Sequence, residues 1–372
     1  MGKSGVCSSG VLSASTMVYV LTALSIVVLI STVYVNSHLN SLLSVSKRIH
    51  NYVSMYIGID SKATVTSNSS SSRHAFSITK PSITRATTPR ATTPGGTTAR
   101  PNECKSCFKH DFDFMLNNED VCQTDTGNST IKVIVLISTI HKNTEKRKAI
   151  RETWMSPYTG NTGPVRYMFL LGRISDKALQ VALETESASY RDILQEDFID
   201  SYNNLTLKTM MAFRWASTFC QKAEFVMKTD DDMFVNINGL LRAVNQHKDV
   251  LQRSVGGFCV LSASPIRDKG SKWYASEKMY PHRKYPGYCS GTGYVTSMFV
   301  TRRVFEISKH LPFFHLEDIF VGLCINKLGY TFTRIGGFST NFIPISCSYK
   351  QSIITSHGVS PKQMRQAWDL KC

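Results

Sequence analysis

Apolar residues fall into short blocks along the second half of the chain, and their spacing predicts alternating strands and helices. Residues 131–139 (IKVIVLIST) form a nearly continuous β-branched run, which is typical of a strand buried on both faces. Residues 165–171 and 224–229 predict two further strands. Helices are expected at 205–219 (capped by Asn203-Asn204), 236–247 and 319–328. This alternation favours one α/β domain with a mainly parallel central sheet.

The amino-terminal part of the chain has a different pattern. Residues 17–35 are mostly apolar, and no charged residue occurs between Lys3 and Lys47. At about 1.5 Å per residue such a helix spans roughly 28 Å, close to the hydrocarbon thickness of a bilayer. A cleaved signal peptide is the alternative, but its apolar region is shorter, about 7–15 residues. We therefore expect a transmembrane signal anchor at 17–35, preceded by a cytoplasmic tail at 1–16.

The segment after the predicted anchor, residues 36–130, is expected to be a stem. Its residues 64–100 contain 17 Ser or Thr in 37 positions. They cannot bury enough apolar surface to offset the entropy of ordering them. Residues 131–372 then form the globular domain.

Sequons and cysteines favour a lumenal side for everything after the anchor. Glycosylation is expected at Asn68, Asn128 and Asn204. Nine of the ten cysteines also follow the anchor, which indicates disulfide bonds. Nine thiols cannot all pair within one chain, so one is free or joins two chains, and a homodimer stays open.

Charge and motifs exclude several function classes. The net charge of +16 invites a nucleic-acid partner, but half of it lies in residues 1–100, and residues 101–372 carry 34 basic and 26 acidic side chains. With the basic stem in the lumen, we expect no nucleic-acid partner. No G-x-G-x-x-G follows a strand and no P-loop motif occurs, which argues against dinucleotide enzymes and P-loop nucleoside triphosphatases.

Three consecutive carboxylates, Asp230, Asp231 and Asp232, follow directly on the strand at 224–229. Their repulsion is costly unless a cation or solvent lies between them. Oxygen ligands suit Mg²⁺ or Mn²⁺ bound with substrate phosphates. In an extended chain Asp230 and Asp232 face one side and Asp231 the other. A solvated acidic turn is the alternative, and the pattern leaves both open.

A second acidic pair, Glu317-Asp318, precedes the helix at 319–328. These carboxylates either cap that helix or supply a general base beside a substrate hydroxyl. His357 is a lone histidine, which is either structural or a ligand.

A Gly- and Tyr-rich segment, residues 285–294, lies between the two acidic clusters. Glycines let the backbone approach a ligand, and aromatic rings stack on sugar faces. A turn with core aromatics is the alternative. The residues concerned are Gly291, Gly293, Tyr288, Trp273 and Tyr274.

An ordered set of these segments resembles the β1,3-galactosyltransferase family of Golgi glycosyltransferases, over about residues 131–372. The anchor and stem match that family's type II layout. The matching segments are RKAIRETW (147–154), FLLG (169–172), DILQEDFIDSYNNLTLKT (192–209), KTDDDMFVN (228–236), SKWY (271–274), YPGYCSGTGY (285–294), HLEDIFVGLC (315–324) and HGVSP (357–361).

The resemblance implies a GT-A type nucleotide-sugar fold, an inverting mechanism and dependence on Mn²⁺. By that resemblance Asp232 and His357 bind the metal, with Asp230 near it, and Asp318 is the catalytic base. The UDP site is assigned to Arg151, Lys208, Asp230 and Asp231. The acceptor site is assigned to Glu317, Trp273, Tyr274, Tyr288, Gly291 and Gly293. Gly287 departs from the family pattern, which commonly has proline there.

The implied function is transfer of galactose from UDP-galactose to the 3-hydroxyl of a terminal GlcNAc or related HexNAc on a glycoprotein or glycolipid, in the Golgi membrane. One base and one metal suffice for a single displacement, whereas a glycoside hydrolase needs two carboxylates flanking the bond. One alternative is a β1,3-N-acetylglucosaminyltransferase that uses UDP-GlcNAc. Another is a catalytically silent chaperone or lectin-like binder, which should have lost Asp232, Asp318 or His357.

Overall fold

The computed structural model describes residues 107–108, 110–123 and 130–372. The predicted anchor at 17–35, the Ser/Thr-rich segment at 64–100, and Asn68 and Asn128 lie outside the described residues. Within the described part, every helix is too short or too polar to cross a bilayer.

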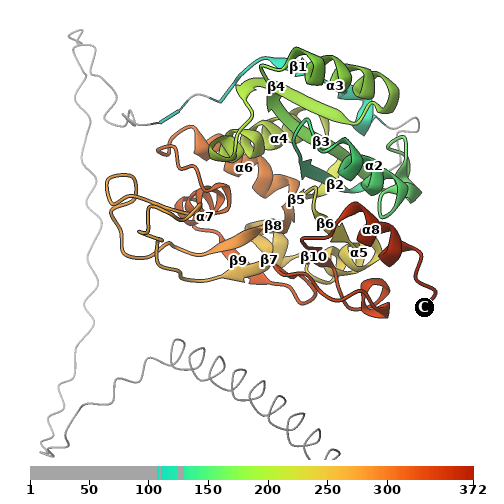
Figure 1. The fold of residues 1–372 in the computed structure, drawn as a ribbon. Coiled ribbons are helices and arrows are strands. Elements are labelled where there is room, and N and C mark those ends of the chain that lie inside the picture. Colours follow the sequence, from blue (N-terminus) through green and yellow to red (C-terminus); the bar gives the residue numbers. More distant parts are fainter. Residues whose placement is uncertain (1–106, 109, 124–129) are drawn as a thin grey trace, which may run out of the picture. The chain divides into compact units, whose positions relative to one another are not determined.

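The centre of the fold is an eight-stranded sheet with strand order β1-β4-β3-β2-β5-β8-β7-β9 (Figure 1). The strands are β1 Phe114–Leu116, β2 Ile131–Ser138, β3 Val165–Arg173, β4 Ile193–Ile199, β5 Ala223–Asp230, β7 Ser254–Val260, β8 Tyr288–Ser297 and β9 Thr331–Arg334. A separate two-stranded ribbon pairs β6 Met233–Val235 with β10 Thr355–His357.

The expected α/β class is confirmed, but the sheet is mixed rather than mainly parallel. Strands β4, β3, β2 and β5 are parallel, whereas β8 runs antiparallel to both β5 and β7. The reason is the connection from β7 to β8, a long loop without a crossover helix, so that β8 returns in the opposite direction.

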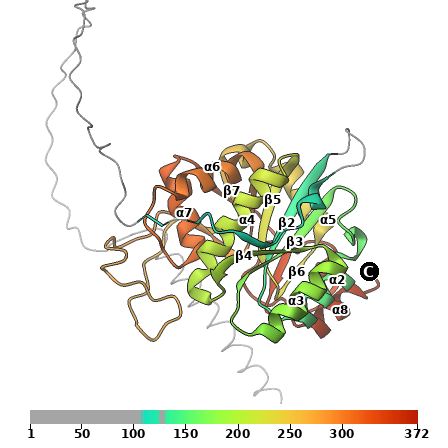
Figure 2. The same ribbon diagram turned by 90° about the horizontal axis from the view of Figure 1, so that it is seen from above.

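Helices cover both faces of the sheet because β2 is apolar on both. Val133, Val135 and Ile137 point into one core and Ile134 and Leu136 into the other. Helices α4 Leu205–Phe219, α6 Met298–Ser308 and α7 Glu317–Lys327 pack on one face. Helices α2 Thr144–Glu152, α3 Lys177–Tyr190, α5 Ile237–Gln246 and α8 Pro361–Trp368 pack on the other (Figure 2).

The predicted helix at 205–219 has the predicted bounds, but Asn204 does not cap it with its side chain. The short helix η3 Tyr202–Asn204 leads directly into α4, so the Asn204 amide turns back and donates to the Ile199 carbonyl at 2.8 Å.

Residues before 131 take part in the folded unit. Strand β1 pairs with β4, and the buried His110 ring lies 2.7 Å from the Ser308 hydroxyl of α6. A disulfide joins Cys122 in helix η1 Glu119–Cys122 to Cys220 after α4. The ordered fold therefore begins earlier than the change in hydrophobic pattern at residue 131 indicates.

The predicted disulfide chemistry is present in the described part. Besides Cys122–Cys220, bonds join Cys259 to Cys289 and Cys347 to Cys372, and Cys107 is also disulfide-bonded. Cys324 is a buried free thiol.

Candidate functional site

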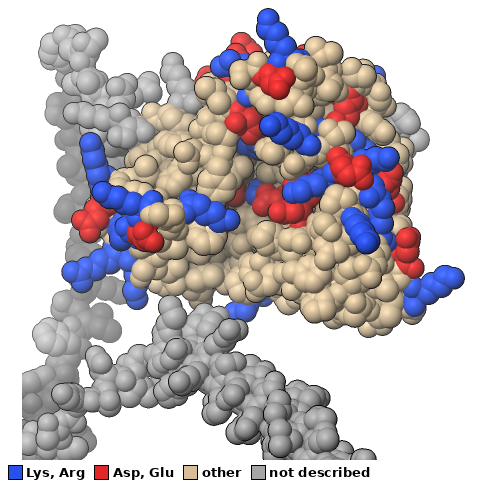
Figure 3. Space-filling view, viewed as in Figure 1, with Lys and Arg blue, Asp and Glu red and all other residues tan. Residues whose placement is uncertain are grey.

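The three consecutive aspartates lie where β5 ends, beside the end of β2, because Asp230 pairs with Ser138 in the parallel ladder. Charged side chains of both signs gather near the centre of the face in Figure 3, where β5 ends in Figure 1. The carboxyl ends of parallel strands are where α/β sheets bind ligands.

Asp231 is buried, and its carboxylate is fully hydrogen-bonded within the protein. Its carboxylate accepts hydrogen bonds from the Thr139 hydroxyl at 2.6 Å, the Asn143 amide at 2.7 Å and the Lys146 ammonium at 2.9 Å. Thr139 and Asn143 lie in the connection between β2 and α2, and Lys146 lies in the first turn of α2. Asp231 therefore ties the aspartate turn to the neighbouring strand and points away from the partners of Asp230 and Asp232.

Asp232 lies beside His357 through the β6–β10 ribbon. His357 pairs with Met233, and the Val359 N–H donates to the Asp232 carbonyl at 2.9 Å. The His357 Nε2 is 3.8 Å from the Asp232 carboxylate, while Nδ1 is 3.1 Å from the Thr340 carbonyl. Because a carbonyl only accepts, Nδ1 donates to Thr340, and Nε2 is the ring nitrogen that faces Asp232.

These two side chains fit a divalent cation. A separation of 3.8 Å lets both reach one ion at roughly 2.1 Å each. A carbonyl that fixes the tautomer of a ligating histidine is the usual outer contact at metal sites. Burial raises the pKa of Asp232, and Asp230 raises it further, so a cation there would relieve the crowding. Among the described side chains, no cluster of three or more His, Cys, Asp or Glu suited to a metal occurs.

Lys228 is a buried cation that the sequence reasoning missed. Its Nζ lies 2.7 Å from the Asp230 carboxylate, 2.7 Å from the Gly291 carbonyl and 3.5 Å from the Glu317 carboxylate. Burial works to lower the pKa of Lys228, but Asp230 and Glu317 outweigh it and the net pKa is raised. The sequence signal that could have found Lys228 is a lysine within the mostly apolar run EFVMKT.

Glu317 lies beneath the site rather than facing an open surface. Its carboxylate accepts from the Tyr294 hydroxyl at 2.6 Å and faces Lys228, and the side chain is buried. Burial raises the pKa of Glu317, and Lys228 opposes that change. The arrangement gives Glu317 the task of holding Lys228, while its assignment to the acceptor stays a prediction.

Asp318 follows at the first turn of α7 and has different partners. Its carboxylate accepts from the Gly291 N–H at 3.2 Å and from the Ile319 N–H at 2.9 Å. Burial raises its pKa, these two backbone groups oppose the change, and Asp230 adds to it. Leu316, not an acidic residue, is the N-cap of α7, so neither carboxylate has the expected capping role. Asp318 is thus a held carboxylate whose pKa is above the ordinary range, as a general base requires.

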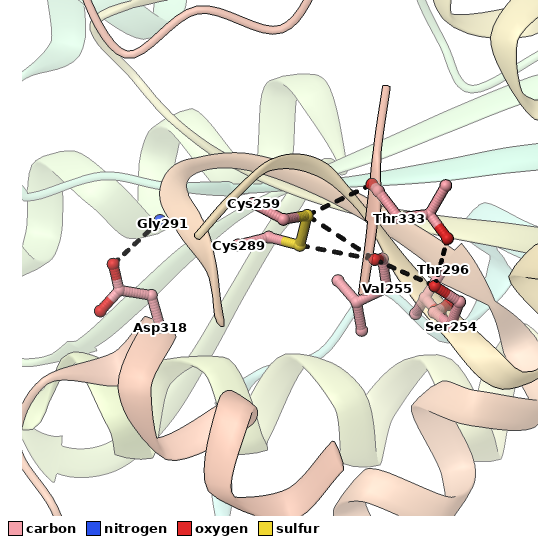
Figure 4. Close-up of a disulfide and its surroundings, with 8 residues drawn as sticks. All are labelled: Ser254, Val255, Cys259, Cys289, Gly291, Thr296, Asp318 and Thr333. Atoms are coloured by element: carbon pink, nitrogen blue, oxygen red, sulfur yellow. Dashed lines mark hydrogen bonds between the residues drawn. A yellow bond between two sulfur atoms is a disulfide. The ribbon is translucent and has the colours of Figure 1, made fainter. Parts of the chain in front are cut away.

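Close packing of α7 on β8 fixes this position. A Cβ atom at Gly322 would lie 2.5 Å from the Gly287 carbonyl oxygen, and one at Gly291 would lie 2.9 Å from the Glu317 carboxylate. Gly287 has φ of +54°, which proline cannot adopt, so its departure from the family pattern changes the local backbone. Figure 4 shows Gly291 and Asp318 facing each other beside the Cys259–Cys289 disulfide.

Arg151 lies apart from Asp318, in a buried ion-pair network on the other side of β2. It makes a two-pronged contact with Asp192, both distances being 2.8 Å, and pairs with Glu186 at 2.8 Å. Lys208 is also buried, pairing with Asp200 at 2.8 Å and donating to the Thr139 carbonyl at 2.6 Å. Burial lowers the pKa of Lys208 and Asp200 opposes the change. Both cations are therefore paired with carboxylates. Lys208 also contacts Thr139, whose hydroxyl donates to Asp231.

Aromatic side chains border the Asp318 side of the site. Trp273 is half exposed, Tyr274 and Tyr288 are partly buried, and Gly293 lies on β8 opposite Thr229. Tyr202, which the sequence reasoning missed, joins them. Burial raises the pKa of its phenol, Asp318 and Asp230 raise it further, and Trp273 opposes the change.

Comparisons with known proteins agree with this geometry. A family model described as Galactosyltransferase matches residues 145–334. Beta-1,3-galactosyltransferase 1 of Homo sapiens and of Mus musculus is 41% identical over 261 residues, covering 70% of this chain and 78% of the relative. Beta-1,3-galactosyltransferase 5 of Pan paniscus is 38% identical over 248 residues, covering 66% of this chain and 82% of the relative.

Two solved structures show a weaker likeness. The WbbM bifunctional glycosyltransferase has a TM-score of 0.37 at 11% identity, covering 67% of this chain and 51% of its own. The galactosyltransferase LgtC, in complex with donor and acceptor sugar analogues, has a TM-score of 0.35 at 12% identity, covering 63% and 94%. At these scores neither carries an argument about this chain.

Proposed function

The chain belongs to the β1,3-galactosyltransferase family and is a β1,3-galactosyltransferase, and we propose that it moves galactose from UDP-galactose to the 3-hydroxyl of a terminal GlcNAc or related HexNAc. The proposal includes a GT-A type fold, a type II anchor in the Golgi membrane and Mn²⁺ as cofactor. The donor nucleotide and the acceptor sugar rest on the resemblance of the ordered motifs to that family.

Asp318 is the residue that we assign as the base. A β product from an α-linked donor needs one in-line displacement. A carboxylate accepts the proton of the acceptor hydroxyl, the hydroxyl oxygen attacks the anomeric carbon, and the bond from that carbon to the β-phosphate oxygen of the leaving UDP breaks. The Gly291 and Ile319 N–H groups orient the Asp318 carboxylate, and the raised pKa of Asp318 keeps it basic enough to accept that proton. Transfer should therefore fall at acidic pH, with a midpoint above that of an ordinary aspartate.

Asp232 and His357 are the residues that we assign to Mn²⁺. When bound, the ion would offset the negative charge that gathers on the departing β-phosphate. Lys228 holds Asp230 at 2.7 Å, so that Asp230 stays oriented beside this pair. Asp231 supports the turn from below through its three donors.

The observation that carries the proposal is that the carboxylates around Lys228 have different partners. Asp230 and Glu317 bind Lys228, whereas Asp318 accepts only from backbone N–H groups and Asp232 faces His357. One carboxylate is thus available for a proton and another for a cation, and a single displacement requires these two groups.

The test is a donor panel with the full-length enzyme, Mn²⁺ and an aryl β-GlcNAc acceptor. UDP-galactose should be used in preference to UDP-GlcNAc and UDP-GalNAc, and product NMR should give a β1,3 linkage. Transfer of GlcNAc, or another linkage, would contradict the proposal.

The base is tested by Asp318→Asn, which should abolish transfer while UDP still binds. Asp249→Asn, a change of the same charge at an exposed position, is the control. Transfer by Asp318→Asn near the wild-type rate would exclude Asp318 as the base.

A further inference from the structure

The loop between β7 and β8, residues 261–287, is strongly basic. It carries six Lys or Arg and two acidic residues, a net charge of +4, which is half of the +8 carried by residues 101–372. Basic side chains gather at the left edge of the molecule, over this loop (Figure 3). Such an excess of one sign attracts ligands of the opposite sign.

The cations of the loop are free to meet a ligand. Arg267 is used within the loop, where it donates to the Ala275, Tyr280 and His282 carbonyls. The other five have no carboxylate within 4.0 Å in the described part of the chain, whereas several exposed cations elsewhere, such as Arg303 with Glu306, are paired. These five exposed side chains are Lys269, Lys272, Lys278, Arg283 and Lys284.

The loop is built as a structure rather than as a loose tether. Tyr280 and Tyr285 are buried and pack on Phe314, with ring centroids 5.7 and 6.0 Å away, in the segment that precedes α7. Isolated bridges join Ala263 to Tyr285 and Ile266 to Tyr274. The backbone that carries the cations is therefore held in place, which reduces the part of the entropy cost of binding that comes from ordering the loop.

The loop ends beside the proposed base. Its two flanks are joined by the Cys259–Cys289 disulfide, and Gly291, two residues further on, donates its N–H to Asp318 (Figure 4). The backbone of Tyr274 also lies against the His315 ring, three residues before Asp318. The basic loop thus borders the Asp318 side of the site, where the proposed function places the acceptor hydroxyl.

Lys272 connects the cations to the aromatic border. Its ammonium lies 4.6 Å from the centre of the Trp273 ring, which is half exposed. A half-exposed ring of the kind on which sugars stack thus lies directly beside a cation of the loop.

We propose that the β7–β8 loop makes this enzyme prefer acidic acceptors, in which a sulfate or carboxylate lies next to the sugar that receives galactose. The proposal rests on the proposed function, since it needs the acceptor to enter beside Asp318. A membrane surface is the less favoured partner, because lipid headgroups on these cations would cover the approach to Asp318.

The experiment compares two acceptors with the full-length enzyme in detergent. One is a neutral disaccharide with terminal GlcNAc, and the other bears a 6-sulfate on the penultimate sugar. A loop variant, Lys272→Gln with Arg283→Gln and Lys284→Gln, is compared with a control variant. The control carries the same charge change at exposed, unpaired positions elsewhere, Lys177→Gln, Lys222→Gln and Lys248→Gln.

The wild-type enzyme should have the higher kcat/KM for the sulfated acceptor, and raising the salt from about 50 to about 300 mM should reduce that advantage. An exposed ion pair contributes a factor of about 1.4 to 5, so three should together contribute about tenfold. The ratio of kcat/KM, sulfated over neutral, should therefore fall about tenfold in the loop variant and stay unchanged in the control variant.

Three results would overturn the inference: equal use of the two acceptors by the wild type, a matching fall in the control variant, or loss of binding to phosphatidylserine vesicles in the loop variant with an unchanged ratio. The last would assign the loop to a membrane. Absence of galactose transfer to either acceptor would instead contradict the proposed function.

Discussion

Gly291 is the residue at which one added methyl group should reveal how the site is held. Its carbonyl accepts from Lys228, its N–H donates to Asp318, and a Cβ atom there would lie 2.9 Å from the Glu317 carboxylate. Gly291→Ala should therefore disturb a residue that contacts Lys228 and also the proposed base Asp318.

The magnitude follows from the geometry. An ordinary contact begins at 3.4 Å, so the Glu317 oxygen must move by about 0.5 Å. Glu317 cannot swing away without cost, because it is buried, accepts from Tyr294 at 2.6 Å and faces Lys228. Overpacking of this kind costs about 1–3 kcal/mol of stability. Since a misplacement of about 1 Å near the chemistry costs about 100-fold, we expect kcat to fall about 10- to 100-fold.

The assay is galactose transfer at saturating donor and acceptor, together with thermal unfolding. Gly336→Ala is the control, because this glycine is exposed and its Cβ atom would have no neighbour within 4 Å. It should lose far less activity. A kcat for Gly291→Ala equal to that of Gly336→Ala would refute the reasoning that links Lys228 and Asp318 through Gly291.

Three further outcomes are expected. Asp232→Asn should weaken the binding of UDP that depends on Mn²⁺, and an unchanged calorimetric Mn²⁺ titration would remove its metal role. Gly287→Ala should lower the free energy of unfolding by about 2 kcal/mol more than Gly329→Ala, because both glycines have positive φ but only Gly287 would place a Cβ atom against a ring, 2.9 Å from Phe332; equal denaturant midpoints would contradict this. Burial lowers the pKa of His110 from 6.5 to about 4, so its contribution to stability is complete above pH 6.5 and is lost as the pH falls through 4. In the wild type, the free energy of unfolding should fall by at most about 3 kcal/mol over that pH range because of His110, and His110→Gln should abolish this fall. An unchanged pH dependence of the free energy of unfolding in the variant would argue against the burial of this ring.

Local pattern was enough for the elements whose environment is uniform along their length. β2 is apolar at nearly every position because both faces are covered, and α4 has an apolar face along its whole length, so both were predicted with nearly the observed bounds. The direction of β8 could not be predicted in this way. Strand direction depends on how the chain travels between β7 and β8, and a strand has the same side-chain period whichever way it runs.

The residue types of the site were also visible in the sequence. Three aspartates after a strand, an acidic pair before a helix and a late histidine were each recognised as candidates. The family resemblance then assigned each of them an expected role as base or metal ligand. Lys228 and Tyr202 were missed because part of their surroundings comes from other elements, such as Gly291 and Glu317 for Lys228.

The sequence by itself predicted an acidic centre after a strand, and the resemblance of its ordered motifs to a known family indicated a glycosyltransferase. Both depend only on the linear chain. Only the tertiary structure decided which partners each carboxylate has. Asp231 and Glu317 are occupied by buried donors, whereas Asp318 and Asp232 are held by backbone groups and faced by His357. Burial and partners set the charge and availability of a carboxylate, and both come from residues that only folding brings together.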